Sequence, residues 1–589
     1  MIDTLPNEII IKIATYLSRK KLCTCLRVCR SWYAAFIPVL YNNVNIQTES
    51  QLNQFVETLR STEETSNPFG HLVRELTLRG QFTTQHIFPL PRLCPFVVEL
   101  NYGRLGWTLE LSKVLQGWKH LKNLGRLAFH YGPREFPLCS LRNRITRLSI
   151  AVTLYPEWID YTAELPYLTE LELAHKSMGV VGKLPKVSLC ELELLHRALP
   201  RLETFSMDTI IIQGEMPEHI MPCSSVRHLR LKDISGRLWG QYFAQKYTNL
   251  EKLFIRKFLE LLLIQKRLNE TEDVSEATFK AQAMTLARSC RRIKSLTTSK
   301  FNHSRDALPF FDVFHQIGAP IEHLDMLCSD PPLYAAVIER FCGTLSHVRL
   351  SFNRMTFNEI VEPLKISPLL VALELCDDSH VMYAEKAVEV DRILDHWNRL
   401  KHLSLTMYDI RLSDSCSTNN QHGLRTLYLE GGIHQDVFPY LSQRCSRLSE
   451  LDINFGYEVR PPKVIYFPNP NIERLLVTLF ELKDYFYKLT WIDKLEQTSE
   501  KRKHFAEGYL KDGDPATGYS WMKWFRSDKG DYYFAKHESQ CLDTLLDEQC
   551  KGCGICDKDG STTSGRHVVW ILCYNVDTVL LSKNSVPSW

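Results

Sequence analysis

The chain has 589 residues, of which 44% are apolar and 24% are charged, and its formal net charge is +3. This length exceeds what a single compact core usually serves, so we expect several domains or an extended repeat array. The composition excludes a chain that is disordered throughout, and the small net charge argues against nucleic-acid binding driven by bulk charge.

The N-terminal segment lacks the features of a secretion signal, because Asp3 stands where a signal peptide would carry basic residues. No run of about 18 or more apolar residues occurs, so we expect no membrane span. The 18 cysteines are then expected to be reduced thiols, and the protein is expected in the cytoplasm, the nucleus or both.

The first 46 residues predict three short helices. Leu5, Ile9, Ile13 and Leu17 recur at the spacing of one helical face, with Pro6 in the first turn. A second apolar face follows from Leu22, and a third helix carries Trp32 and is expected to end before Pro38. So small a bundle encloses little core, so its large apolar residues predict a surface that another protein covers. The alternative is a helical cap that seals the segment behind it.

The run LPNEIIIKIATYLSRKKLCTCLRVCRSWYAAFIPVLYNNVNI resembles an F-box. It has the Leu-Pro-x-Glu-Ile start, the aliphatic-Tyr-Leu end of the first helix and the Val-Cys-Arg-x-Trp core of that family. The resemblance implies docking on a Skp-type adaptor, which links the chain to a cullin. The residues that it implies for adaptor binding are Leu5, Pro6, Ile9, Ile13, Leu17, Leu22, Leu26, Val28, Cys29 and Trp32. The chain departs from the family at Lys20 and Lys21, where an acidic residue is usual.

A motif of the form L-x-x-L-x-L recurs from residue 72 to residue 477. The second aliphatic of each copy falls at 76, 100, 127, 148, 171, 205, 229, 253, 296, 324, 348, 373, 403, 427, 451 and 475. Seven of the intervals are 24 residues, which is typical of leucine-rich repeats, each with a short strand whose alternate side chains face the core. Cys94, Cys290 and Cys445 precede three copies, as in the cysteine-containing repeats that often follow an F-box. The longest interval predicts an inserted helix at about 257–270, which is either a partner-binding element or a tolerated loop elaboration.

The outward strand positions of two adjacent repeats form a basic patch. They are His228, Arg230, Lys232, Lys252, Phe254 and Arg256. Such a patch could bind an acidic or phosphorylated target segment, because arginine forms bidentate hydrogen bonds with carboxylate and phosphate groups. The alternative is an ordinary solvated face. Farther on, the outward strand positions form an acidic face instead. They are Tyr428, Glu430, Glu450, Asp452 and Asn454.

The last hundred residues change in composition and are rich in aromatic side chains. The piece WMKWFRSDKGDYYFAK predicts a β-hairpin, and HVVWILCYNVDTVLL predicts a buried strand. Cys550, Cys553 and Cys556 are spaced closely enough to hold a zinc ion, with His537, Cys541, His567 or Cys573 as the fourth ligand. The alternative is a set of reduced surface thiols without any cofactor, because a second ligand pair is missing.

No phosphate-binding loop, dinucleotide fingerprint, nucleophile elbow or HExxH motif occurs, so we expect no enzyme activity of the chain itself. The sequence predicts an α/β fold: a right-handed leucine-rich-repeat solenoid of about 16 repeats, with a three-helix F-box and a small C-terminal β-rich cap. The expected segments are an F-box at 1–46, a linker and first-repeat cap at 47–70, repeats at 71–480, and the cap module at 481–589. The expected function is substrate recognition in an SCF-type ubiquitin ligase, with an unknown protein target and neither nucleic acid nor membrane as a partner. The alternative is a repeat scaffold that acts outside the ligase.

Overall fold

A computed structural model gives the fold of the chain. It describes residues 7–15, 22–23, 25–80, 82–102, 109–128, 141–152, 158–175, 185–256, 276–299, 307–353, 355–377, 387–416, 421–455, 464–467, 472, 474–479, 485–491, 519–526, 532–537, 567–573 and 578–583. The chain divides into two compact units, the first with residues 1–299 and 309–320 and the second with residues 300–308 and 321–589.

The first unit is built on a layer of parallel strands, each hydrogen-bonded to the next along the chain. These strands are β1 (Asn43–Ile46), β2 (Glu75–Leu78), β3 (Glu99–Tyr102), β4 (Asn123–Ala128), β5 (Arg147–Val152), β6 (Glu170–His175), β8 (Thr204–Asp208), β10 (His228–Lys232), β11 (Lys252–Arg256) and β12 (Ser295–Ser299). The predicted α/β class with a long parallel sheet is therefore confirmed, and the arrangement is consistent with a solenoid-like repeat.

The register of the strands places the repeated aliphatic residues side by side. Leu76 pairs with Leu100, and Leu229 pairs with both Phe205 and Leu253. In β10 the burial alternates, since Leu229 and Leu231 are buried while Arg230 between them is exposed. This alternation is what a strand with one covered face requires.

One repeat position differs from the prediction. In β4 the residue in register with Leu100 and Leu148 is Leu124, not Leu127, which pairs with Ile150 after a register shift. The shift begins at Gly125, where an added Cβ atom would lie 1.9 Å from Asn101 Oδ1. A bulge adds one residue to β4, and this extra residue changes the spacing between its leucines. The repeat motif therefore pointed to Leu127 instead of Leu124.

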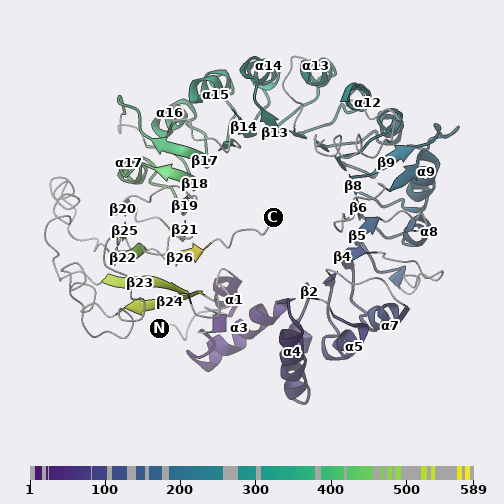
Figure 1. Cartoon of the computed structure of the whole chain (residues 1–589), viewed down its shortest axis with the longest axis horizontal. Coiled ribbons are helices and arrows are strands. Elements are labelled where there is room, and N and C mark those ends of the chain that lie inside the picture. Colours follow the sequence, from purple (N-terminus) through teal and green to yellow (C-terminus); the bar gives the residue numbers. More distant parts are fainter. Residues whose placement is uncertain are drawn as a thin grey trace. The chain divides into compact units, whose positions relative to one another are not determined.

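Helices cover one face of this strand layer (Figure 1). Behind the N-terminal helices they are α4 (Glu49–Thr62), η2 (Phe69–Leu72), α5 (Thr84–Ile87), α6 (Leu90–Leu93), α7 (Leu109–Gly117), α8 (Trp158–Ala163), α9 (Leu189–Ala198), α10 (Trp239–Lys246) and α12 (Glu276–Ala287), with most of α13 (Leu308–Gln316). A two-stranded ribbon of β7 (Lys186–Ser188) and β9 (Ile211–Gln213) accompanies α9. The predicted inserted helix at about 257–270 lies outside the described residues.

The segment predicted as a linker and first-repeat cap, residues 47–70, contains the 14-residue helix α4. Thr48 caps this helix and forms a reciprocal pair of hydrogen bonds with Gln51, and Leu52, Val56 and Leu59 are buried on one face. An N-cap threonine with glutamine three positions on is a standard helix-start signal, so the start of α4 can be read from the sequence.

The N-terminal end contains α1 (Asn7–Thr15) and α3 (Arg30–Asn42), which contact each other. The sequence predicts that the last of these helices ends before Pro38, but α3 continues through Pro38. A proline inside a helix forfeits one backbone hydrogen bond. The additional turn brings the ring of Tyr41 within 4.8 Å of the Phe69 ring, between centroids, and this packing offsets part of the loss.

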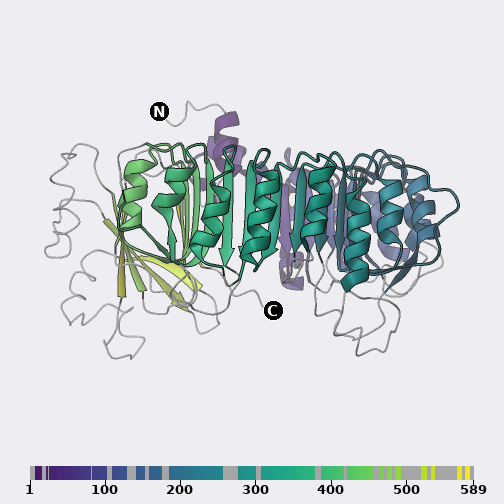
Figure 2. The ribbon, with the colours of Figure 1, turned by 90° about the horizontal axis from the view of Figure 1, so that it is seen from above.

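The second unit repeats the same plan with longer strands. Its parallel strands are β13 (His323–Cys328), β14 (His347–Phe352), β15 (Ala372–Asp377), β17 (His402–Arg411), β18 (Thr426–Ile433), β19 (Glu450–Phe455), β21 (Arg474–Leu479) and β26 (Thr578–Lys583), with β16 (Ala387–Glu389) beside β17. Its helices are α14 (Pro331–Phe341), α15 (Phe357–Leu364), α16 (Val390–His396) and α17 (Val437–Arg444). Figure 2 shows the teal and green helices side by side along their strands.

A second sheet lies in the C-terminal part of this unit. It has the order β20 (Val464–Phe467), β25 (His567–Cys573), β22 (Tyr485–Trp491), β23 (Tyr519–Arg526) and β24 (Tyr532–His537). The predicted hairpin is confirmed, because β23 and β24 pair antiparallel with Trp524 opposite Phe534. The single buried strand predicted after residue 566 is wrong: β25 joins this sheet, while β26 pairs with β21 of the parallel layer.

Within the described segments, no helix combines the length and the apolar character that crossing a membrane requires.

Candidate functional site

The N-terminal helices share a hydrophobic core. Among the side chains that the structure describes, its buried members are Ile10, Ala14, Leu22, Ala35 and Phe36, each at most 4% exposed. Partly buried side chains surround it, among them Cys25, Leu26, Trp32, Val39 and Leu40. A bundle of roughly 40 residues is marginally stable on its own, so its stability depends on further contacts.

The residues predicted to bind an adaptor occupy different environments. Leu22 belongs to the core, Leu26, Cys29 and Trp32 are half-buried, and Val28 is 60% exposed. Leu5, Pro6 and Leu17 lie outside the described residues, as do the side chains of Ile9 and Ile13. The structure thus brings Leu22, Leu26 and Trp32 together around one core.

Two further apolar side chains of these helices face solvent. Ile11 is 39% exposed and Tyr33 is 43% exposed, and neither was selected from the sequence. Ile11 lies outside the apolar stripe of its helix, so the apolar periodicity of the sequence gives no reason to select it. An exposed apolar residue off the stripe is itself a signal of a partner, particularly when Val28 is exposed nearby in the chain.

Cys29 and Trp32 also have a local role in forming α3. Cys29 has the extended backbone of an N-cap, and its Sγ accepts a hydrogen bond from the Trp32 backbone N–H at 3.5 Å. The indole Nε1 of Trp32 is buried without a hydrogen-bond partner. Its ring lies 5.1 Å from the Phe36 ring, between centroids, so the tryptophan joins the core to the bundle surface.

The predicted basic patch lies on adjacent strands β10 and β11. Their register places His228 beside Lys252, Arg230 beside Phe254 and Lys232 beside Arg256. Arg230 and Lys252 are exposed, and the Arg230 guanidinium carbon lies 4.6 Å from the centroid of the Phe254 ring. The structure therefore brings all the predicted residues onto one face.

Two of these groups are already engaged. Lys232 Nζ donates to Asp208 Oδ2 at 2.7 Å. Burial and the positive charge of Lys252 lower the pKa of His228, and its Nδ1 lies 3.3 Å from the Thr204 hydroxyl. His228 is therefore neutral near pH 7, which leaves Arg230 and Lys252 as exposed cations of the patch.

The face of β18 and β19 in the second unit has the opposite character. The Glu430 carboxylate accepts hydrogen bonds from Tyr428 Oη at 2.6 Å and from Asn454 Nδ2 at 2.8 Å. Burial and the hydrogen bond to Glu430 raise the pKa of Tyr428, so its hydroxyl stays protonated and continues to donate. The predicted acidic character of this face therefore rests on an ordered network.

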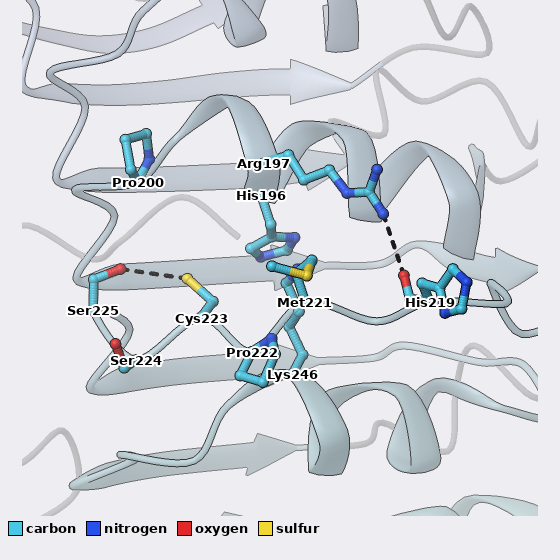
Figure 3. Close-up of a pocket in the computed structure, with 10 residues that line it drawn as sticks. All are labelled: His196, Arg197, Pro200, His219, Met221, Pro222, Cys223, Ser224, Ser225 and Lys246. Atoms are coloured by element: carbon cyan, nitrogen blue, oxygen red, sulfur yellow. Dashed lines mark hydrogen bonds between the residues drawn. The ribbon is translucent and has the colours of Figure 1, made fainter.

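A pocket of about 670 Å³ lies between the C-terminal ends of α9 and α10 (Figure 3). It exists because the stretch from β8 to β10, which is described throughout, contains β9 but no helix. A loop fills the gap instead, and its residues His219, Met221 and Cys223 line the pocket together with His196 and Lys246.

Behind the pocket lies a buried polar network that the sequence did not reveal. Lys246 Nζ donates to Glu193 Oε2 at 2.8 Å, and Tyr242 Oη donates to the same oxygen at 3.3 Å. His196 contacts the Tyr247 hydroxyl through Nε2 at 2.5 Å and the Leu192 carbonyl through Nδ1 at 2.6 Å. Glu193, His196 and Lys246 are each at most 3% exposed.

The environment sets the charges of this network. Burial opposes ionisation of Glu193, but its hydrogen bonds to Lys246 and to the Met221 backbone outweigh that effect and lower its pKa. Burial lowers the pKa of His196 to about 4. Each polar group is thus paired inside the chain, which is typical of a structural tie between two helices.

The predicted zinc ligands Cys550, Cys553 and Cys556 lie outside the described residues, so the zinc site stays a prediction. Among the residues that are described, no cluster of three or more His, Cys, Asp or Glu side chains could hold a metal ion. Metal analysis of the purified chain, with and without Cys553→Ser, tests the prediction.

Comparison with known proteins places the N-terminal segment. Residues 2–47 match the family model described as F-box-like. The chain is 32% identical over 129 residues to the SCF E3 ubiquitin ligase complex F-box protein pof2 of Schizosaccharomyces pombe. This match covers 21% of the chain and 27% of the length of that protein.

Solved structures resemble the chain over a larger part. The crystal structure of a TLR13–ssRNA13 complex matches with 13% identity and a TM-score of 0.33, covering 72% of this chain and 67% of that one. The crystal structure of the yeast Rad7 and Elc1 complex matches with 15% identity and a TM-score of 0.32, covering 74% and 94%. The match at residues 2–47, together with the resemblance to a named F-box protein, shows that the chain carries an F-box-like segment at residues 2–47.

Proposed function

We propose that the chain is the substrate-recognition subunit of an SCF-type ubiquitin ligase. In this proposal the N-terminal helices bind a Skp-type adaptor, and through it a cullin. The parallel layers act as a right-handed leucine-rich-repeat solenoid of about 16 repeats that binds the protein target. The observation that carries the proposal is the F-box-like match at residues 2–47, in a segment whose described side chains include exposed Ile11, Val28 and Tyr33.

The physical argument concerns the small N-terminal core. A short helical bundle that exposes the apolar side chains of Ile11, Val28 and Tyr33 gains stability when a partner covers that surface. Removing apolar surface from water contributes about 25 cal/mol per Å², so an adaptor that covers these residues stabilises both the complex and the bundle.

The proposed mechanism needs no chemistry from this chain. A receptor holds its target near a ubiquitin-charged conjugating enzyme, which raises the effective concentration of the target lysines. This role accords with a chain whose sequence contains no recognised catalytic motif. We further propose a cytoplasmic or nuclear location, where ligases of this kind would meet their targets.

Co-purification with a Skp-type adaptor tests the proposal. We expect the unaltered chain to form a stable complex and Val28→Asp to weaken it by more than about tenfold, because a buried carboxylate would face an apolar partner surface. Phe88→Asp is the matched control: Phe88 is 70% exposed but lies between α5 and α6, outside the F-box-like segment. Val28 is exposed, so its substitution should leave the bundle folded.

The result also separates two roles. A complex that contains adaptor and cullin supports the ligase receptor. Adaptor binding without cullin would favour a scaffold that acts outside the ligase, and no adaptor binding at all, or equal losses in Val28→Asp and Phe88→Asp, would refute the proposal.

A further inference from the structure

The strands β8, β10, β11 and β12 place their outward side chains in rows. One row contains Thr204, His228, Lys252 and Ser295, and the next contains Ser206, Arg230, Phe254 and Thr297. Because the strands are parallel and in register, neighbours within a row lie about 5 Å apart. The exposed cations therefore stand among an aromatic ring and several hydroxyl groups.

Arg230 is held in a defined orientation. Its guanidinium carbon lies 4.6 Å from the centroid of the Phe254 ring, which is half-buried and so fixed in place. A guanidinium over an aromatic face keeps the N–H donors at its edges available for hydrogen bonds, and it loses less side-chain freedom when a ligand binds. Arg230 is thus preorganised to bind an anion.

Two cations of this patch, Arg230 and Lys252, differ from other charged side chains on the strand faces. Arg147 pairs with Glu170 at 3.0 Å in the first unit, and Arg349 pairs with Glu374 at 3.2 Å in the second. Among the described residues, no carboxylate lies within ion-pair distance of Arg230 or Lys252. Arg230 and Lys252 therefore present positive charge that no described carboxylate compensates.

The neighbouring strand on one side carries the opposite charge. Glu172 of β6 stands in the same row as Ser206 of β8 and accepts a hydrogen bond from the neutral Ser149 hydroxyl, whereas Glu170 of the same strand is paired with Arg147. An anionic ligand is repelled from β6 and attracted to β10 and β11, which fixes its position across the sheet. A nucleic acid has negative charge along its whole length and would meet the Glu172 carboxylate, so a short acidic protein segment fits better.

We infer that the exposed face of β10 and β11 binds an acidic segment of a protein target, with several Asp or Glu side chains. Arg230 and Lys252 stand on different strands and in different rows, so the positive charge is spread out. Spread-out cations match carboxylates that follow one another along a peptide better than they match one phosphate group. The inference rests on the proposed function only in calling the bound protein the target.

Binding of a labelled peptide tests this inference with the full-length chain. The probe is a fluorescent 15-residue peptide with glutamate at alternate positions, and the control peptide has glutamine at the same positions. We expect binding by fluorescence anisotropy only to the glutamate peptide, weakened about tenfold when the salt concentration rises from about 0.05 M to 0.3 M.

Substitutions in the patch identify the residues involved. We expect Arg230→Ala and Lys252→Ala each to weaken binding about three- to tenfold, because each removes one charged contact. Arg230→Lys should recover part of the loss, since it restores the charge but not the stacked planar group. Arg349→Ala is the matched control: it is an exposed strand arginine in the second unit, already paired with Glu374, and should leave binding unchanged.

Four results would overturn the inference: no binding of the glutamate peptide, equal binding by the patch variants, tighter binding of a peptide with a single phosphoserine and no other acid, or tighter binding of a single-stranded RNA oligonucleotide. Adaptor co-purification, measured on the same variants, should stay unchanged. A failure of peptide binding with intact adaptor binding therefore rejects the inference alone, and the reverse pattern rejects the proposed F-box function.

Discussion

Lys246→Met probes the buried tie between α9 and α10. The substitution keeps most of the side-chain volume but leaves the Glu193 carboxylate, whose side chain is 4% exposed, without its buried cation. Removing one partner of a buried ion pair costs about 3–5 kcal/mol. Glu193 retains Arg197 at 3.2 Å and the Met221 backbone N–H at 3.1 Å, so we expect the lower end, about 3 kcal/mol.

Hydrogen exchange resolved by peptide is the appropriate assay, because a chain of two units is not expected to unfold in one step. We expect the opening free energy of α9 and α10 to fall by that amount, while helices of the second unit keep their protection. The double variant Glu193→Gln and Lys246→Met should recover about 2 kcal/mol, because it leaves no unpaired charge.

Arg349→Met supplies the control, since its ion pair with Glu374 is half-exposed and such pairs contribute about 0–1 kcal/mol. If Lys246→Met costs no more than this control, or if the double variant is as unstable as the single one, then the buried pair does not hold the two helices together and the argument is refuted.

Three further predictions follow from single positions. Burial lowers the folded-state pKa of His196 from 6.5 to about 4, so the unfolded state takes up the proton first as the pH falls. The free energy of unfolding should therefore be unchanged above pH 6.5 and should fall by about 3 kcal/mol towards pH 4. Denaturation measured as a function of pH should show a smaller fall for His196→Phe. Gly431→Ala should lower thermal stability by about 2 kcal/mol or more, since Gly431 has φ +122° and an added Cβ would lie 1.6 Å from the Met407 carbonyl oxygen, whereas Gly423→Ala, with open space around it, should be neutral. Leu229→Ala should cost about 2–5 kcal/mol in denaturant unfolding. The exposed neighbour Arg230, changed to alanine, should cost much less; equal costs would contradict the assigned strand faces.

The strand register could be predicted from the sequence because one simple physical rule sets it. An aliphatic residue at each second strand position must face the covered side, so Leu229, Leu253 and their equivalents recur at a fixed interval. The rule failed at β4, where the register shifts after Leu124 and where Gly125 leaves no room for a Cβ atom beside Asn101 of the neighbouring strand. Such a contact between strands has no local sequence signature.

The basic patch was also accessible from the sequence, because strand alternation assigns Arg230 and Lys252 to the outer face. The ion pair between Lys232 and Asp208 could not be predicted from the sequence, because it depends on which strands are neighbours. The network of Glu193, His196 and Lys246 is even harder to predict from the sequence. Its partners stand about 50 residues apart and meet only because one repeat between them lacks a helix.

The pairing of β26 with β21 has a consequence for the order of folding. Most strands of the parallel layers dock on a neighbour that was synthesised about 24 residues earlier, whereas Val579 pairs with Leu475 across about 100 residues. Closing that longer loop costs about 1 kcal/mol more chain entropy. During synthesis, the edge of β21 that pairs with β26 stays open until β26 emerges, so this part of the second unit should fold late and should need protection from aggregation.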